Sequence, residues 1–357
     1  MREHGGGLRA ASRRYGIALE GWIDLSTGIA PWPYPLPAIP PAVWQRLPEN
    51  DDGLLEIAQG YYGAAQLMPL NGSQAAILAL PRVFAPRTVA VLAPSYSEYA
   101  PAWRAVGHSV CESAAGEILH SAADVIMLAN PNNPDGSRFA RQELLAAAER
   151  LRVGRRWLIV DEAFADADDE NSLVRLAGTG EAPNLIVLRS LGKFFGLAGA
   201  RVGFCAARPA MFTRLERQLG PWPLGNPARF VAKVGLGDTA WQAAQKRKLQ
   251  EASARLAQRL AECGLAPCGG TALFQYVRHA DAAALHEFLA RRGILVRCFA
   301  EPSALRFGLP ATENDWARLA LALAEWGSKG TTSKGTTFGT AANVSLAPVA
   351  GGYPKAR

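Results

Sequence analysis

The sequence lacks the features that mark membrane, secreted or metal-binding proteins. No apolar run approaches the roughly 18 residues that a membrane helix needs. The N-terminal residues hold three consecutive glycines and several arginines but no apolar core, so we expect no secretory signal. The 5 cysteines are scattered, with no CxxC pair and no histidine cluster, which predicts buried reduced thiols and no metal site. We therefore expect a cytoplasmic protein that does not enter a membrane.

The positive charge of the chain is concentrated near its C-terminus. The formal net charge is +7, from 38 Lys and Arg against 31 Asp and Glu. The segment from Gly327 to Arg357 carries four of the basic residues and no acid, so the rest of the chain has 34 against 31. That body lacks a dense basic run, a helix-turn-helix pattern and an aromatic RNA-binding motif. We predict no nucleic-acid partner.

The two ends of the chain carry few signals of regular structure. Residues 1–41 form an N-terminal arm that we expect to be irregular, because six prolines stand between Pro31 and Pro41. Such an arm is expected to lie extended over another surface, of this subunit or of a partner. Residues 328–357 contain SKGTT twice and few large apolar residues, which predicts a disordered tail.

Between the ends, apolar runs alternate with helical patterns. Helices are expected at residues 54–62, 73–83 and 141–151, and buried strands at 88–93, 124–129, 157–160 and 185–188. This alternation favours an α/β fold with a mostly parallel sheet, which we place in a large domain over residues 42–222. Ligands of such sheets bind beyond the carboxyl ends of the strands.

The pattern changes after Pro223, where a smaller C-terminal α/β domain is expected over residues 223–327. A long helix at about residues 239–263 would link the two domains. It is followed by expected strands at 272–277, 294–298 and 304–307 and by expected helices at 281–292 and 313–326.

The most informative motif is RSLGKFFGLAGARVG, from Arg189 to Gly203. It begins at the end of the last strand predicted for the large domain and leads into another short apolar run, 202–206. Its glycines allow tight turns and close approach to a bound group. Lys193 stands among them, with Ser190 before it and Arg201 after it. We favour an amine that bonds covalently to a phosphate-bearing cofactor over a solvated loop lysine.

Polar residues at the other strand ends complete a site for pyridoxal 5'-phosphate. This cofactor needs a lysine, a carboxylate beside its ring nitrogen, a donor to its phenolic oxygen and an aromatic cover. The candidates, in that order, are Lys193, Asp161, Asn133 and Tyr96. Each has an ordinary explanation by itself, such as a helix cap for Asp161 or a plain turn around Asn133. Their order at successive strand ends favours one common site.

The cofactor phosphate needs a cup of hydrogen-bond donors. Backbone amides at Gly72, Ser73 and Gln74 begin a predicted helix, whose dipole favours an anion. Ser190 and Arg201 would close this cup from the other side.

These residues make the chain resemble the fold type I pyridoxal phosphate enzymes over roughly residues 24–326. NPNNPDG (130–136), VDEAF (160–164) and RSLGKFFGLAGARVGF (189–204) are similar to motifs that histidinol-phosphate aminotransferases share with threonine-phosphate decarboxylases. HGG (4–6), DLSTGIAP (24–31) and PWPLGN (221–226) resemble the decarboxylases more closely. Residues 47–53 lack the tyrosine that in relatives reaches the neighbouring subunit's cofactor phosphate, and Ala30 stands where relatives often have asparagine.

The resemblance implies a homodimeric lyase of cobalamin biosynthesis. It would decarboxylate L-threonine O-3-phosphate to (R)-1-amino-2-propanol O-2-phosphate, with Arg306 binding the substrate carboxylate. We expect His4 and Arg297 to meet the substrate phosphate, although Arg297 could equally form a structural ion pair. The bond that breaks must stand perpendicular to the cofactor ring, so the protein selects the reaction by how it holds the carboxylate. Freed Lys193 would return a proton to the same carbon.

Two other functions stay open at the level of the sequence. An aminotransferase acting on histidinol phosphate or an aromatic amino acid would use the same cofactor residues. A non-catalytic protein could retain the fold to bind a ligand or a partner, but the intact set of Lys193, Asp161 and Arg201 argues against it.

Overall fold

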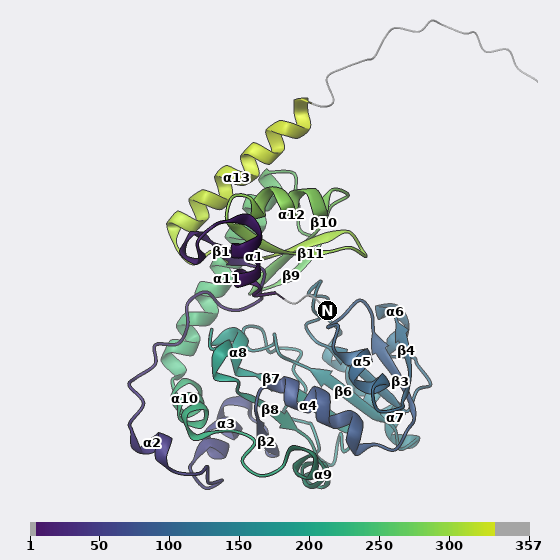
Figure 1. Ribbon diagram of the computed structural model, residues 1–357. Coiled ribbons are helices and arrows are strands. Elements are labelled where there is room, and N and C mark those ends of the chain that lie inside the picture. Colours follow the sequence, from purple (N-terminus) through teal and green to yellow (C-terminus); the bar gives the residue numbers. More distant parts are fainter. Residues whose placement is uncertain (1–4, 333–357) are drawn as a thin grey trace, which may run out of the picture.

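The structure is a computed structural model that describes residues 5–332 of the 357-residue chain. It contains two sheets, one in each of two bodies, and the long helix α11 (Thr239–Glu262) runs from the larger body to the smaller one (Figure 1). The described part of the chain has no helix with the length and apolarity needed to cross a membrane.

The larger sheet is mostly parallel. Its seven strands follow the order β2-β8-β7-β6-β5-β3-β4, and only the pairs that involve β8 are antiparallel. The strands are β2 (Leu67–Leu70), β3 (Thr88–Leu92), β4 (Ser109–Ser113), β5 (Val125–Ala129), β6 (Trp157–Asp161), β7 (Leu185–Ser190) and β8 (Gly203–Ala206). The predicted α/β fold with a mostly parallel sheet is confirmed.

Successive strand residues point to opposite faces of this sheet, and apolar residues point to both. Helices therefore cover both faces. On β6, Leu158 and Val160 join one hydrophobic core, whereas Trp157 and Ile159 join another. The first core includes residues of α3 (Leu54–Tyr62), α7 (Arg141–Val153) and α10 (Asn226–Gly237). The second includes residues of α4 (Ser73–Ala79), α5 (Tyr99–Arg104) and α9 (Pro209–Leu219). Burial on both faces explains the continuous apolar runs in the sequence.

The smaller sheet has five strands in the order β1-β11-β12-β10-β9. β1 pairs parallel with β11, and the other pairs are antiparallel. Its strands are β1 (Ile23–Leu25), β9 (Gly269–Thr271), β10 (Phe274–Arg278), β11 (Ile294–Phe299) and β12 (Ala304–Gly308). Helices α12 (Ala282–Ala290) and α13 (Glu313–Thr332) lie in the same body as this sheet (Figure 1).

The described residues near each end of the chain are more regular than the sequence predicted. The N-terminal arm contains α1 (Leu8–Tyr15) and the edge strand β1, so the prediction of an irregular arm was wrong over these residues. Trp22, Ile23 and Leu25 are buried there, and the proline-rich segment that led to the prediction begins only at residue 31. Helix α13 continues through Thr332, so residues 328–332 are helical rather than disordered. The remainder of the predicted tail, 333–357, lies outside the described residues.

Candidate active site

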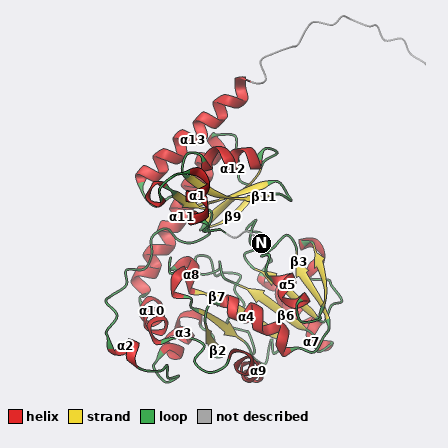
Figure 2. Cartoon of the chain, in the orientation of Figure 1, coloured by secondary structure: helices red, strands yellow, loops and turns green. Residues whose placement is uncertain are grey.

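A cavity of about 580 Å³ lies at the carboxyl edge of the larger sheet, and residues of the smaller sheet contribute to its wall. The strands of both sheets, yellow in Figure 2, approach the region between the two bodies. Every predicted site residue within the described part of the chain lines this one cavity: Gly72, Ser73, Gln74, Tyr96, Asn133, Asp161, Ser190, Lys193, Arg201, Arg297 and Arg306. His4 lies outside the described residues.

Lys193 lies in the short helix α8 (Leu191–Phe194), directly after β7. The N-terminal arm fixes this turn, because the Ala30 amide donates to the Lys193 carbonyl at 2.9 Å. Gly196 lies in the left-handed region at φ 67°, and a Cβ there would stand 2.7 Å from the Cα of Pro33. The close approach that this glycine permits is therefore to the arm rather than to a ligand.

The Lys193 amine is held in a weakly basic state. Burial and the positive charge of Arg306 lower the pKa of Lys193 to about 8, against the opposing effect of Asp161. The Nζ atom lies 5.6 Å from the ring centroid of Phe164. A lysine with this pKa has a neutral, nucleophilic fraction near neutral pH.

Asp161 ends β6 and is 4% exposed. Tyr99 Oη donates to its Oδ2 at 2.8 Å, and the Ala163 amide donates to Oδ1 at 3.0 Å. Burial raises the pKa of the Asp161 carboxyl, although these hydrogen bonds and the charge of Lys193 oppose the shift. A buried carboxylate with a raised pKa is a strong acceptor for a proton on a neighbouring basic group.

Tyr96 follows β3 and lies edge-on to Tyr99, with ring centroids 5.4 Å apart and an interplanar angle of 80°. Its hydroxyl donates to Gln74 Oε1 at 3.1 Å, which links the loop after β3 to the start of α4. Burial and the carboxylates of Glu98 and Asp161 raise the pKa of Tyr96 to about 12, so the phenol stays neutral.

The start of α4 forms a compact cradle with the chain around β8. The first amides of a helix have no partner within the helix, so those of Ser73 and Gln74 are available donors. A Cβ at Gly72 would stand 2.8 Å from Nη2 of Arg201, and one at Gly203 would stand 2.4 Å from the Ser73 amide nitrogen. Glycine at both positions thus lets a guanidinium and helix amides converge on one point, as an anion site requires.

Two arginines of the smaller sheet contribute to the wall of the same cavity. Arg306 on β12 and Arg297 on β11 are direct cross-strand neighbours. Arg306 Nη1 donates to Asn133 Oδ1 at 2.6 Å, so the Asn133 carboxamide keeps its nitrogen as a donor. Burial and the charge of Arg297 lower the pKa of Arg306 to about 10, while Asp24 opposes the shift. Arg297 Cζ lies 5.4 Å from the ring centroid of Phe299.

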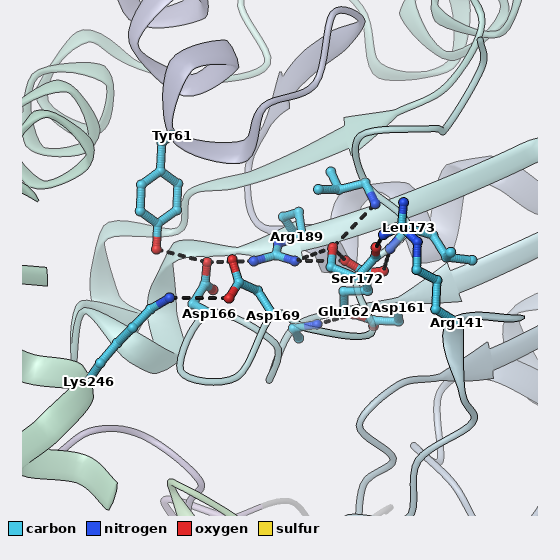
Figure 3. A network of polar contacts seen from close by, with 12 residues as sticks. Tyr61, Arg141, Asp161, Glu162, Asp166, Asp169, Ser172, Leu173, Arg189 and Lys246 are labelled. Carbon is cyan, nitrogen blue, oxygen red and sulfur yellow. Dashed lines mark hydrogen bonds and ion pairs between the residues drawn. The ribbon is translucent and has the colours of Figure 1, made fainter. Parts of the chain in front are cut away.

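A second polar network joins residues at the ends of β6 and β7 (Figure 3). Arg189 precedes Ser190 on β7, and its guanidinium bridges Glu162 Oε2 at 2.7 Å and Asp166 Oδ1 at 2.8 Å. Ser172 Oγ and the Leu173 amide donate to the carboxylate of Glu162. These contacts tie the end of β6 to the end of β7, and so hold Asp161 and Ser190 in register on the cavity side.

Sequence reasoning missed several residues of the site. Tyr99 ends the motif PSYSEY that also contains Tyr96, so the motif carried a signal for a second aromatic residue near the site. The Glu162–Arg189 pair could have been inferred from charges at the ends of apolar strands, because buried charges need partners. Asp24 and Ser26 carried no such signal, since their contacts depend on how the N-terminal arm folds.

The chain is similar in sequence to known enzymes over most of its length. Residues 56–323 match the family described as Aminotransferase class I and II. A threonine-phosphate decarboxylase from Pseudomonas aeruginosa is 52% identical over 90% of this chain and 97% of that protein. A threonine-phosphate decarboxylase from a Sinorhizobium species is 42% identical, again over 90% of this chain and 97% of the relative.

Solved structures share the fold at lower identity. A histidinol-phosphate aminotransferase from Sinorhizobium meliloti in complex with pyridoxal 5'-phosphate superimposes with a TM-score of 0.77 at 20% identity, over 90% of this chain and 95% of that one. An L-threonine-O-3-phosphate decarboxylase from Porphyromonas gingivalis superimposes with a TM-score of 0.70 at 22% identity, over 85% and 98%. At these identities the two structures establish the fold alone.

Proposed function

Because the chain belongs to the class I and II aminotransferase family, we propose that its cavity is the active site of a pyridoxal phosphate-dependent lyase that decarboxylates L-threonine O-3-phosphate. The two decarboxylase relatives are matched over 97% of their length, so the resemblance includes both sheets and the cavity between them. The products are carbon dioxide and (R)-1-amino-2-propanol O-2-phosphate, the latter an intermediate of cobalamin biosynthesis, as the sequence motifs implied.

The cavity fits pyridoxal 5'-phosphate. Because residue 72 is glycine, the Arg201 guanidinium can lie beside the start of α4, where it and the first helix amides would donate to a phosphate. Lys193 would hold the cofactor covalently and Asp161 would pair with the ring nitrogen. Asn133 would donate to the phenolic oxygen and Tyr96 would cover the ring. The phosphate would rest on the backbone amides of Ser73 and Gln74 at the start of α4 and on the side chains of Ser190 and Arg201. The Gly72 amide, which the sequence predicted as a further donor, donates to the Leu70 carbonyl at 2.7 Å instead.

Bound pyridoxal phosphate supplies an electron sink for the pair released when a bond to the substrate α-carbon breaks. The protein determines which bond that is. Arg306, held at a fixed place by Asn133 and the Ser26 carbonyl, binds the substrate carboxylate and orients its bond for cleavage. After carbon dioxide leaves, the α-carbon needs a proton. Lys193, with a pKa of about 8, can carry that proton at Nζ and deliver it.

The observation that carries the substrate assignment is the cross-strand pair Arg297 and Arg306, both on the wall of the cavity that contains Lys193. The charge of Arg297 contributes to the lowered pKa of Arg306, and a ligand with two anionic groups would interact favourably with both guanidinium groups. L-threonine O-3-phosphate has a carboxylate and a phosphate. We therefore assign the carboxylate to Arg306 and the phosphate to Arg297, with His4 as the further candidate from the N-terminal residues.

We also propose that the enzyme is a cytoplasmic homodimer. Trp44 is 65% exposed, Leu47 62% and Trp222 55%, which is unusual for large apolar side chains. Their segments lie close together, because the Asn226 side chain donates to the Arg46 carbonyl at 2.9 Å. A second copy of the chain would cover this surface. Light scattering should give a dimer, and a fully active monomer would contradict this part of the proposal.

A paired assay tests the function. Purified protein with pyridoxal phosphate receives L-threonine O-3-phosphate alone in one reaction, and histidinol phosphate with 2-oxoglutarate in the other. Mass spectrometry should find aminopropanol phosphate in the first reaction, with no keto acid required. Glutamate in the second reaction and nothing in the first would instead identify an aminotransferase that uses the same cofactor residues.

A further inference from the structure

The turn from Asp24 to Ser26 contacts both the N-terminal segment at Gly6 and Arg306 on β12. Asp24 lies in β1, the edge strand of the smaller sheet, and its carboxylate Oδ1 accepts hydrogen bonds from two groups of Ser26. The backbone amide of Ser26 donates at 2.9 Å and its hydroxyl donates at 2.6 Å. An aspartate that binds the amide two residues onward makes a tight local turn. Ser26 is 3% exposed, so this turn is part of the packed interior.

The Ser26 carbonyl is one of the two acceptors that orient Arg306. Arg306 Nη2 donates to it at 2.9 Å, while Nη1 donates to Asn133. The two acceptors come from different bodies, Asn133 from the larger one and Ser26 from the smaller one. Arg306 Nε is buried and has no hydrogen-bond partner among the described residues. The direction of the guanidinium therefore depends on where the Asp24–Ser26 turn places the carbonyl.

The Ser26 side chain also holds the N-terminal segment at Gly5 and Gly6 beside this turn. The Gly6 amide donates to Ser26 Oγ at 2.8 Å. A Cβ at Gly5 would stand 2.4 Å from the Ser26 carbonyl oxygen, so the segment packs directly on the group that binds Arg306. Gly5 also lines the cavity. The first described residues of the chain are thus attached to the cavity wall through one serine.

We propose that Ser26 is a positioning residue that fixes the carboxylate-binding Arg306 and the N-terminal wall of the cavity at the same time. This inference rests on the proposed function. Its hydroxyl donates to Asp24 and accepts from Gly6, so its loss loosens the turn at both ends. A loosened turn lets Arg306 rotate, and the carboxylate it binds then spends less time in the orientation from which carbon dioxide leaves. A larger share of the bound substrate then loses a proton from the α-carbon instead, and that loss begins transamination.

Ser26→Ala in the cofactor-loaded enzyme tests this role. We expect kcat/KM for L-threonine O-3-phosphate to fall about five- to tenfold, as for the loss of one or two hydrogen bonds. The ratio of decarboxylation to abortive transamination should fall as well, measured as aminopropanol phosphate against keto product. Amide hydrogen exchange at Gly6 should accelerate. Ser26→Thr keeps the hydroxyl and should restore all three quantities toward the wild-type values.

Two further variants keep the test decisive. Asp24→Ala removes the other end of the turn and should reproduce the Ser26→Ala effects, which covers the case in which Ser26→Ala does not fold. Asp24→Asn keeps an oxygen acceptor and should show a smaller loss. If both alanine variants fold and leave the product ratio and the Gly6 exchange unchanged, the positioning role is wrong. Wild-type protein that fails to decarboxylate would refute the proposed function instead, while the Gly6 exchange would still report on the turn.

Discussion

Arg189 at the end of β7 and Arg306 on β12 are both buried, yet their pKa values move in opposite directions. Arg189 is 2% exposed and Arg306 is 6% exposed. Burial would lower the pKa of Arg189, but Asp166 and Glu162 overcome this effect and hold the pKa well above its usual range. At Arg306, burial and neighbouring Arg297 lower the pKa to about 10. The neutral acceptors Asn133 and Ser26 orient Arg306 without neutralising it.

This difference separates a structural arginine from one that is available to a ligand. The Arg189 guanidinium is neutralised by two carboxylates of the protein, and its removal would leave buried negative charge without a partner. A guanidinium held by neutral oxygens, with a second arginine beside it, gains from the arrival of an anion. Alternation of side-chain direction produces the split. Asp161 and Ser190 line the cavity, whereas Glu162, directly after β6, and Arg189, just before Ser190 on β7, belong to the network drawn in Figure 3.

The largest effect is expected at the cavity amine. Lys193→Ala should reduce kcat/KM by at least ~10²–10⁴-fold, the usual contribution of a general acid or base, because the covalent attachment and the proton donor are both lost. Thermal unfolding should change little. Lys248→Ala, which removes an exposed lysine 3.8 Å from the ring centroid of Trp32, is a matched control that should keep full activity. Wild-type turnover by Lys193→Ala would overturn the site.

The network behind the cavity should matter for stability instead. Arg189→Leu leaves Glu162 and Asp166 without their cation, so the free energy of unfolding should fall by about 3–5 kcal/mol. Urea unfolding followed by circular dichroism measures this loss. A variant as stable as the wild type would mean that the buried carboxylates take up protons at no cost, and that the network does not hold the strand ends together.

Arg306→Leu should give the reverse result. Activity should fall by about 10²-fold, because the substrate carboxylate loses its orienting partner, while the free energy of unfolding stays near the wild-type value. Arg306→Lys keeps the charge without the paired donors and should recover only part of the activity. A large loss of stability with intact kcat/KM would assign Arg306 to the structure and remove the contrast with Arg189.

The smallest effect is expected at Asp52, an arginine-bound carboxylate that is only partly buried. Burial would raise its pKa, but hydrogen bonds from Arg229, the Leu54 amide and Lys233 overcome this and lower the pKa to about 2. A carboxyl whose folded pKa lies below its unfolded value of about 4 stabilises the fold above pH 4 and loses that contribution as the pH falls toward 2. The Asp52 carboxylate therefore contributes about 2 kcal/mol to the free energy of unfolding above pH 4.

Asp52→Asn should therefore be less stable than the wild type at pH 6, and the difference should shrink on acidification. Unfolding by urea at a series of pH values measures it. A constant difference across that range would show that the Arg229 contact does not depend on the charge of Asp52.

The cavity was more predictable from the sequence than its supports were. Lys193, Asp161 and Asn133 stand at the ends of strongly apolar strands, and parallel strands bring their carboxyl ends to one edge. The contacts of Arg189 depend on which face each strand residue takes, and those of Ser26 depend on the folding of the N-terminal arm. That arm was predicted irregular because its prolines dominated the pattern, although β1 is formed by buried apolar residues that precede them. Pairing with a strand 271 residues away, as between Ile23 and Ile294, leaves no local signal.

The most direct test of the central claim follows the carboxyl group of the substrate. Wild-type enzyme loaded with pyridoxal phosphate receives L-threonine O-3-phosphate labelled in its carboxyl carbon, with no keto acid present. We predict labelled carbon dioxide in equal amount to aminopropanol phosphate, and neither product from Lys193→Ala. Label retained in a keto acid, with no carbon dioxide released, would contradict the account.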